Sequence, residues 1–348
     1  MHVIFSHSAH PLPPSRVRKG EPRRGLAFRI LINIVISTPR TPHRFDLVSI
    51  GECLVELSRR EDGTYRVGFA GDAFNSLFYA ARLGLRTGFV SAVGDDLFTP
   101  MIVEGIAAEG IDTTEMPIVA GRRNGLYFIE TDKAGERSFH YWRAGSAATQ
   151  RLLTGDQKKL VEYARDSRRL LLTGVSMAVL DGEEKLDELL RQLSGSTRIL
   201  LDSNYRPQLW PSVDRYRDRV RTLLTLVDTF LPSRDDLAAL WPEKSLEEVF
   251  RDCHAYGVRT IIVKMGADGC VIKEKGAPRI IPAPTVATIV DTTGAGDAFN
   301  GGYIAGKTRG LSTLEACALG QSVAARTLQV RGAIDRDFRE ETMRREER

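Results

Sequence analysis

Cysteine is scarce in this chain, with four in 348 residues. The four lie far apart and share no spacing typical of a metal site: Cys53, Cys253, Cys270 and Cys317. A disulfide framework is typical of small secreted domains, and this pattern does not indicate one. We therefore expect free thiols that pack as small apolar side chains in a reducing cytoplasm.

A long hydrophobic run is also lacking. The apolar run at residues 30–36 contains Asn33 and is too short for a transmembrane helix, which needs about 20 apolar residues. The residues after it, 37–40, make a poor cleavage site for a signal peptide. We expect no membrane partner.

The net charge is small, at +4, and unevenly distributed. Residues 1–45 are rich in arginine and contain a single acid, Glu21, so the rest of the chain is mildly acidic. This balance predicts no nucleic-acid partner. The basic extension at 1–44 has three interpretations: a disordered tail, the product of a start codon assigned too far upstream, or a transit peptide.

Small residues dominate the segment 291–302, Asp-Thr-Thr-Gly-Ala-Gly-Asp-Ala-Phe-Asn-Gly-Gly. Ile289 and Val290 are expected to end a strand, and Asp297 to open a helix. Glycines let backbone N–H groups crowd around an anion, and a helix N-terminus adds positive potential there. Asp297 beside such a site suits a base for phosphoryl transfer, and it equally suits a residue that starts a helix.

Two ordered motifs resemble the ribokinase-like (PfkB) family of carbohydrate kinases. One is the segment 291–299. The other is Gly-Asp-Ala-Phe-Asn at 71–75, which is similar to the family's sugar-binding Gly-Gly-x-x-x-Asn, with Ala70 in place of the first glycine. The resemblance covers roughly residues 44–334 and implies a kinase domain at 45–335, followed by a charged tail at 336–348.

Strands and helices alternate along the body of the chain. We expect strands at 45–50, 87–93, 170–174, 198–202, 229–231 and 259–264, with helices between them. The alternation predicts an α/β fold with a mainly parallel central sheet and helices on both faces, whose ligands bind beyond the carboxyl ends of the strands.

One region breaks this alternation, because aromatic-rich strands flank a turn at 132–136 and predict a hairpin. The resemblance implies a ribokinase-like fold in which a small β-sheet lid, from about 62–70 and 122–143, closes over the sugar. In some members of the family this lid also joins two copies.

The resemblance implies roles for the glycine-rich segment. Asp297 would take the proton from the attacking sugar hydroxyl as the phosphoryl group arrives. The backbone amides of Gly294, Ala295 and Gly296 would hold the charge that develops on the phosphoryl oxygens. The implied cofactors are ATP and Mg²⁺.

Further segments resemble nucleotide-binding parts of the family. Lys264, Gly266 and Gly269 match a Lys-x-Gly-x-x-Gly loop, which would serve equally as a hairpin turn. Ser233 and Asp236 stand where many members have Asn-x-x-Glu for magnesium and phosphate. The shorter Asp236 would act on magnesium through water or only cap the next helix.

Gln321 would line the adenine side by resemblance, although its spacing also suits a packed helix.

Segments 124–143 and 202–207 resemble those of 2-keto-3-deoxygluconate kinases, one branch of the family. This substrate has a carboxylate, which a guanidinium fork can hold with two charge-assisted bonds. Arg143 and Arg206 are the candidates, and the alternative is that they form structural ion pairs. The resemblance assigns further substrate contacts to the following residues: Gly71, Asp72, Asn75, Tyr127 and Tyr141.

The expected activity is ATP-dependent phosphorylation of the C6 hydroxyl of this sugar acid. The alternatives are another sugar kinase of the family, such as a fructokinase, and a non-catalytic sugar sensor with the same fold. A dehydrogenase is disfavoured because no Gly-x-Gly-x-x-Gly run follows the first strand. We expect a small-molecule partner, and the lid offers a route to a homo-oligomer.

Overall fold

A computed structural model describes residues 43–60, 62–131, 137–180 and 182–340. The predicted basic extension up to residue 42, the hairpin turn at 132–136 and the end of the charged tail from residue 341 lie outside the described residues. The four cysteines are buried and free, as expected. Among the described helices, none is both long and apolar enough to span a bilayer.

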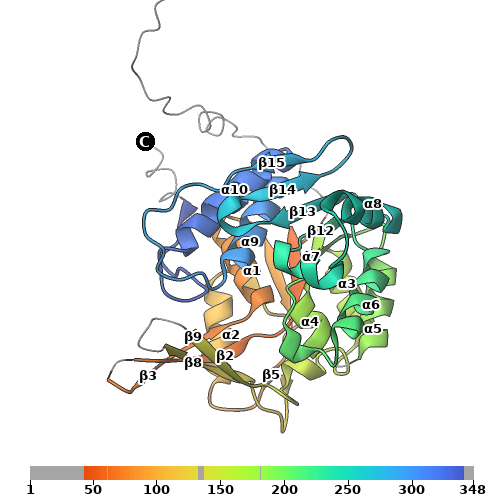
Figure 1. Cartoon of the computed structure of the whole chain (residues 1–348). Helices are drawn as coiled ribbons and strands as arrows, with labels where there is room; N and C mark the ends of the chain where they lie inside the picture. The colour runs from red at the N-terminus through yellow and green to blue at the C-terminus, as the bar shows by residue number, and fades with distance from the viewer. Residues whose placement is uncertain (1–42, 61, 132–136, 181, 341–348) are drawn as a thin grey trace, which may run out of the picture. The chain divides into compact units, whose positions relative to one another are not determined.

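A nine-stranded sheet forms the centre of the fold, and the predicted α/β class is confirmed (Figure 1). The seven strands that come first in the sequence pair in parallel, and the last two in the sequence, β14 and β15, form an antiparallel edge. In spatial order they are β15 (Arg279–Ile281), β14 (Cys270–Lys273), β13 (Thr260–Lys264), β12 (Thr229–Phe230), β11 (Arg198–Asp202), β10 (Arg169–Thr173), β1 (Leu47–Ile50), β4 (Thr87–Val90) and β6 (Ile111–Asp112).

Helices cover both faces of this sheet because alternate side chains of each strand point to opposite faces. In β11, Ile199 and Leu201 join one apolar cluster and Leu200 joins the other. The first cluster includes side chains of α3 (Gln157–Arg165), α5 (Glu183–Leu193), α6 (Val213–Leu224) and α8 (Leu246–Tyr256). The second includes side chains of α1 (Asp72–Arg82), α2 (Thr99–Ala108), α9 (Ala295–Thr308) and α10 (Thr313–Thr327).

Two adjacent glycines let α9 pack closely against both of its neighbours. A Cβ on Gly301 would lie 2.8 Å from the Ser76 carbonyl oxygen of α1, and one on Gly302 would lie 2.8 Å from the Cα of Gly320 in α10. Both distances are shorter than real Cβ contacts. The end of the glycine-rich motif therefore serves helix packing, whereas its beginning faces the site.

A separate four-stranded sheet, in the order β3-β2-β8-β9, projects beside the central one (Figure 1). Its strands are β2 (Leu54–Arg59), β3 (Tyr65–Ala70), β8 (Leu126–Thr131) and β9 (Arg137–Trp142). The predicted hairpin is β8 and β9, but β2 was not predicted. This strand lies inside the small sheet, pairing antiparallel with β3 and parallel with β8.

The remaining elements are short. They are β5 (Val93–Gly94), which pairs with β7 (Ile118–Val119), the helices α4 (Gly174–Val179) and α7 (Arg234–Leu240), and 3₁₀ turns at Ala148–Gln150, Pro207–Leu209 and Gly266–Asp268.

The strand predicted to end at Val290 was wrong. The amides of Val290 and Asp291 both donate to the carbonyl of Leu328, just beyond α10, and Ile289 and Val290 are exposed. The glycine-rich segment is thus anchored to the end of a helix and does not leave a strand. Helix α9 also begins two residues earlier than expected, at Ala295.

Candidate active site

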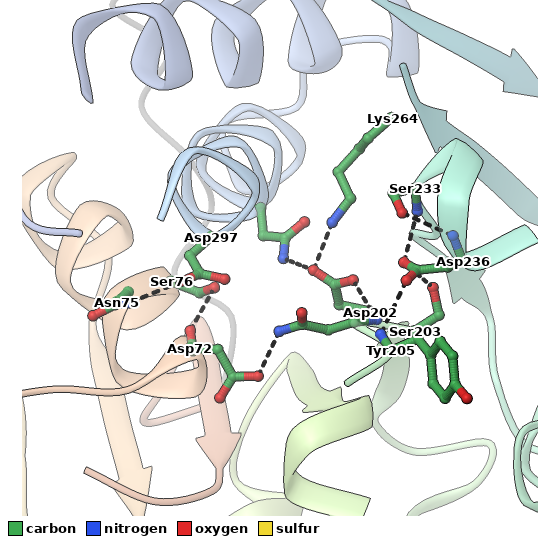
Figure 2. A network of polar contacts seen from close by, with 12 residues as sticks. Asp72, Asn75, Ser76, Asp202, Ser203, Tyr205, Ser233, Asp236, Lys264 and Asp297 are labelled. Atoms are coloured by element: carbon green, nitrogen blue, oxygen red, sulfur yellow. Dashed lines mark hydrogen bonds and ion pairs between the residues drawn. The ribbon is translucent and has the colours of Figure 1, made fainter. Parts of the chain in front are cut away.

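Several of the predicted site residues, among them Asp72, Lys264 and Asp297, gather at the carboxyl ends of the parallel strands (Figure 2). Asp202 is the last residue of β11, and Lys264 is the last residue of β13. The first turns of α1 and α9 bring Asp72 and Asp297 to the same place. This is the edge of a parallel sheet where ligands bind in open α/β folds.

A hydrogen bond joins the two family-like motifs across 222 residues of sequence. The Nδ2 group of Asn75 in α1 donates to Oδ2 of Asp297 in α9, at 2.8 Å. The N-cap of α9 is Gly294, and no side chain caps this helix. The contacts therefore do not support the alternative in which Asp297 serves only to start the helix.

The carboxyl group of Asp297 is held partly in its protonated form. Burial raises its pKa to about 8, and the nearby carboxylates of Asp72 and Asp202 add to the rise. The Asn75 hydrogen bond and the charge of Lys264 oppose it. Such a pKa is suited to a group that accepts a proton near neutral pH.

Positive potential surrounds the N-terminus of α9. Among the described residues, the amides of Gly294 and Gly296 have no hydrogen-bond acceptor, and the amide of Ala295 makes only a 3.4 Å contact with the Thr292 carbonyl. A Cβ built on Gly296 would lie 3.6 Å from Nζ of Lys264. Free amides, a helix dipole and an ammonium group together form a site for an anion.

Gly294 is required by the shape of this turn. Its φ of 76° is in the left-handed region, and a Cβ there would lie 2.6 Å from the Ala333 carbonyl oxygen. Any side chain would therefore both strain the backbone and displace the loop that packs on it.

Asp202 holds the centre of the polar network, and sequence reasoning did not select it. Its Oδ2 atom accepts hydrogen bonds from Lys264 Nζ and Asn300 Nδ2, each at 2.6 Å. Its Oδ1 atom accepts from the amide of Asn204 at 3.2 Å. Its position at the end of a predicted parallel strand was the signal that could have identified it.

Asp72 belongs to the edge of the same network. Its Oδ2 atom accepts from Asn204 Nδ2 at 2.8 Å and its Oδ1 atom from the amide of Ala73 at 2.8 Å. Burial raises the pKa of Asp72, and the negative charge of Asp202 contributes. Gly71 precedes it where a Cβ would lie 2.2 Å from the Glu52 carbonyl oxygen.

The two candidate arginines differ in their surroundings. Arg143 forms an ion pair with Glu52, with side-chain exposures of 12% and 2%. This is the structural ion pair that the sequence left open, although the Nε atom of Arg143 and the Oε2 atom of Glu52 are buried without partners. Glu52, which follows β1, was not selected from the sequence; burial raises its pKa to about 7.

Arg206 is exposed and makes no ion pair with any carboxylate of the described residues; its guanidinium donates a hydrogen bond to the Tyr205 carbonyl. It still lies near the site, because its charge lowers the pKa values of Asp72 and Tyr141 against the larger effect of burial.

The two candidate tyrosines form a register pair on one face of the small sheet. Tyr127 is buried and donates its hydroxyl to Glu56, so its polar atom is already used within the sheet. Tyr141 is 46% exposed, stacks on Tyr127 and lies under the guanidinium of Arg143, whose Cζ is 4.0 Å from the ring centroid. Tyr141 is therefore the one available to a ligand.

The carboxylate of Asp236, the candidate metal ligand, already accepts hydrogen bonds as part of a helix cap. Its oxygens accept from Ser203 Oγ at 2.8 Å and from the amides of Tyr205 and Ser233 at 3.0 Å. Ser233 Oγ in turn accepts from the Asp236 amide, which completes a capping box at the start of α7. These contacts favour the helix-cap interpretation over direct metal contact.

The remaining nucleotide candidates lie around β13 and β14. Gly266 and Gly269 bound a 3₁₀ turn with positive φ, and a Cβ on Gly269 would lie 2.0 Å from the Ile281 carbonyl oxygen. Gln321 is buried and donates to that same carbonyl at 3.0 Å. It therefore fixes β15 against α10, as a residue of a packed helix.

Comparison with known proteins agrees with this geometry. The model of the pfkB family carbohydrate kinases matches residues 44–339. A 2-dehydro-3-deoxygluconokinase of Escherichia coli (strain K12) is 36% identical over 295 residues, which is 82% of this chain and 95% of the relative.

Solved structures share the fold. A PfkB protein from Polaromonas sp. JS666 superposes with a TM-score of 0.74 at 27% identity, covering 84% of this chain and 98% of the other. An E. coli structure in complex with ATP and Mg²⁺ superposes with a TM-score of 0.74 at 23% identity, covering 86% and 98%. Because the family match extends over most of the chain and includes both motifs of the site, this protein belongs to the pfkB family of carbohydrate kinases.

Proposed function

We propose that this kinase transfers the γ-phosphoryl group of ATP to the C6 hydroxyl of 2-keto-3-deoxygluconate (2-dehydro-3-deoxygluconate). The observation that carries the proposal is the pairing of Asp297 with the open N-terminus of α9, near Arg206, which has no carboxylate partner among the described residues. The name of the E. coli relative supports the choice of sugar acid.

In the proposed mechanism, the Asn75 amide group orients Asp297 so that the carboxylate accepts the proton of the attacking hydroxyl. The amides of Gly294 and Gly296 hold the charge on the transferred group, and Lys264 adds its positive charge on the same side. Asp202 keeps the Lys264 ammonium in place through their 2.6 Å ion pair.

The anion cradle at α9 fits the phosphates of ATP. When bound, ATP supplies the phosphoryl group and Mg²⁺ neutralises its charge. Magnesium is usually held by one or two carboxylates together with phosphates and water, so no dedicated cage of protein ligands is needed. The described residues contain no cluster of three His, Cys, Asp or Glu side chains suited to a metal, in line with this mode of binding.

The carboxylate of the sugar acid is assigned to Arg206, with Arg143 and Tyr141 beside it. A neutral sugar would leave this charge unused, whereas a sugar acid would form two parallel charge-assisted bonds with it. The buried Glu52–Arg143 pair supplies a fixed wall of the pocket.

A coupled assay with ATP and Mg²⁺ over a panel of sugars tests the substrate. We expect a strong preference in kcat/KM for 2-keto-3-deoxygluconate over fructose and ribose. Arg206→Gln should reduce kcat/KM for the sugar acid by about 10- to 100-fold, the effect of losing a charged hydrogen-bond pair, and leave that for fructose unchanged.

Arg191→Gln is the matched control, since Arg191 is exposed and forms ion pairs with Asp187 and Glu188 of its own helix. A preference for fructose over the sugar acid would rule out the proposed substrate.

We also propose that the small sheet acts as the lid over the sugar and joins two copies of the chain. Its outer face exposes the apolar side chains of Tyr65, Val67 and Trp142, and clustered exposed apolar side chains mark protein–protein contacts. A cytoplasmic location is proposed from the four free cysteines and the use of ATP.

A further inference from the structure

A second cavity lies at the opposite end of the central strands. Its volume is about 580 Å³, within the range of small-molecule pockets. The first residues of four parallel strands line it: Arg169 of β10, Arg198 of β11, Thr229 of β12 and Thr260 of β13. The kinase site is formed at the last residues of two of these strands, so this basal cavity is a separate place in the fold.

Basic side chains dominate the wall of the basal cavity. Five of them line it, against two carboxylates: Arg169, Arg198, Arg259, Lys275 and Lys307. The carboxylates, Asp228 and Glu274, already have partners. Asp228 contacts Arg198 and Arg259, and Glu274 accepts from Arg279 and from the Thr313 hydroxyl.

Two half-buried cations of this wall lack a counter-ion. Within the described part of the chain, no carboxylate lies within ion-pair distance of Arg169 or Lys307. Arg169 donates to the hydroxyl of Thr308 at 2.9 Å, and Lys307 donates to the Leu311 carbonyl at 3.0 Å and to the Thr313 hydroxyl at 3.3 Å. Neutral acceptors satisfy some of their hydrogens. The charge of Glu274 favours the charged form of Lys307 and that of Asp46 favours the charged form of Arg169, but neither carboxylate lies within ion-pair distance of its cation.

This arrangement is electrostatically costly without an anion. Burial lowers the pKa of both Arg169 and Lys307, and the charge of Arg198 lowers each further. Clustered like charges away from water repel one another and lose hydration. An anion with two negative charges would relieve both costs, and a neutral ligand would relieve neither.

We propose that the basal cavity binds a multiply charged oxyanion, inorganic phosphate or a small phosphate ester, held by Arg169 and Lys307. Helix α9 connects this cavity to the kinase site, since Asp297 lies in its first turn and Tyr303 and Lys307 of its last turns line the cavity. At a rise of 1.5 Å per residue the two ends are about 15 Å apart along the helix axis. The ligand would therefore be distinct from any anion held at the N-terminus of α9.

Calorimetric titration of the full chain with inorganic phosphate tests the proposal. The kinase site is first filled with a non-hydrolysable ATP analogue and Mg²⁺, and ionic strength is held constant with chloride. We expect saturable phosphate binding to the wild type and an affinity at least about tenfold weaker in the double variant Arg169→Gln, Lys307→Gln, because both charged hydrogen-bond donors to the anion are lost.

Arg191→Gln, on the exposed face of α5, is the matched control and should bind phosphate as the wild type does. Equal affinity in the wild type and the double variant would overturn the proposal, and so would the absence of saturable binding to the wild type. If the double variant fails to fold, Lys275→Glu decides, because Lys275 is exposed and can change without disturbing the core. Its phosphate affinity should fall, and an unchanged affinity would refute the site.

A second titration with 3-phosphoglycerate distinguishes the two sources of the oxyanion. Tighter binding than that of phosphate, weakened by the same double substitution, identifies a phosphate ester as the ligand. Binding no tighter than that of phosphate identifies the inorganic ion.

Discussion

Three carboxylates and one ammonium group share a small volume at the kinase site. Asp72, Asp202 and Asp297 each influence the ionisation of a neighbour, and Lys264 is paired with Asp202. Burial raises the pKa of Asp297 to about 8, and the charges of Asp72 and Asp202 add to the rise. Burial raises the pKa of Asp72 as well, and Asp297 is the one of the two that lies in the first turn of α9 beside the free amides.

Replacing Asp297 with asparagine tests this role. Asp297→Asn keeps the size of the side chain and removes the proton acceptor, so kcat should fall by about 10²- to 10⁴-fold. Binding of ATP and of the sugar, measured by calorimetry, should persist. Asp214→Asn, at an exposed position on α6, is the control and should leave turnover unaltered. Undiminished turnover of Asp297→Asn would show that another group takes the proton.

The same residue predicts a pH dependence. The active form of Asp297 is deprotonated, so kcat/KM of the wild type should rise about tenfold per pH unit on the acid side and level off above a pH of about 8. The Asn75 hydrogen bond stabilises the charged form and lowers this pKa. Asn75→Ala should therefore move the acid limb to higher pH. A limb that stays in place, or moves down, would contradict the assignment.

At the scale of the element, the start of α7 has a structural role at the position where many family members have a motif for magnesium and phosphate. The capping box of Ser233 and Asp236 fixes the start of α7, and Asp236 also holds Ser203 and the Tyr205 amide beyond β11. The loop that carries Asn204 and Arg206 is thereby tied to the start of α7. Ser233 and Asp236 therefore stabilise the loop at the edge of the site without lying in the site themselves.

Asp236→Ala distinguishes this structural role from a metal role. It leaves three donors without an acceptor, one of them on the buried Ser203, so the free energy of unfolding in urea should fall by about 1–3 kcal/mol. The dependence of turnover on Mg²⁺ concentration should stay as in the wild type. Asp235→Ala, at the exposed neighbouring position of the same helix, should change neither quantity. A raised Mg²⁺ requirement with unchanged stability would instead favour a metal ligand.

At the scale of the whole molecule, the small sheet has two different faces. One carries Glu56, Tyr127 and Tyr141; the hydroxyl of Tyr127 donates to Glu56, and Tyr141 stacks on Tyr127. The other carries an aromatic surface in which Phe128 contacts Tyr65 and Trp142, with ring centroids 5.6 and 5.0 Å away. Trp142 is 67% exposed, so this aromatic cluster is open in the single chain, and the same face also carries the ion pair of Arg59 with Glu130.

Trp142→Glu should disrupt the proposed association of two copies. A charge at the centre of an apolar interface is left without water, and this cost favours the separated chains. Sedimentation equilibrium should give a dimer for the wild type and a monomer for Trp142→Glu. Ile280→Glu, an equally exposed position on β15, is the control and should remain a dimer. A monomeric wild type would refute association through the lid.

The α/β class, most strands of the central sheet and the two site motifs could be predicted from the sequence. Buried parallel strands give continuous apolar runs, and the glycine-rich anion turn has a local signature, so both patterns are visible in short windows. Helices at 234–240 and 246–256 were predicted with the bounds that the structure has. The sequence also predicted that Asp297 lies in the first turn of a helix, because it directly follows the glycines that open that helix.

Only the tertiary structure decided which side chains are already partnered. Arg143 and Arg206 were equal candidates in sequence, but Glu52 pairs with the first and no carboxylate of the described residues with the second. In the same way, Tyr127 is hydrogen-bonded to Glu56 and Asp236 is used in a helix cap, so neither is free to bind a ligand. Such partners come from distant segments, as do Asp202 at the centre of the network and the cations of the basal cavity. A local pattern states what a side chain can do, whereas the folded chain decides, through the free energy of each contact, what remains for it to bind.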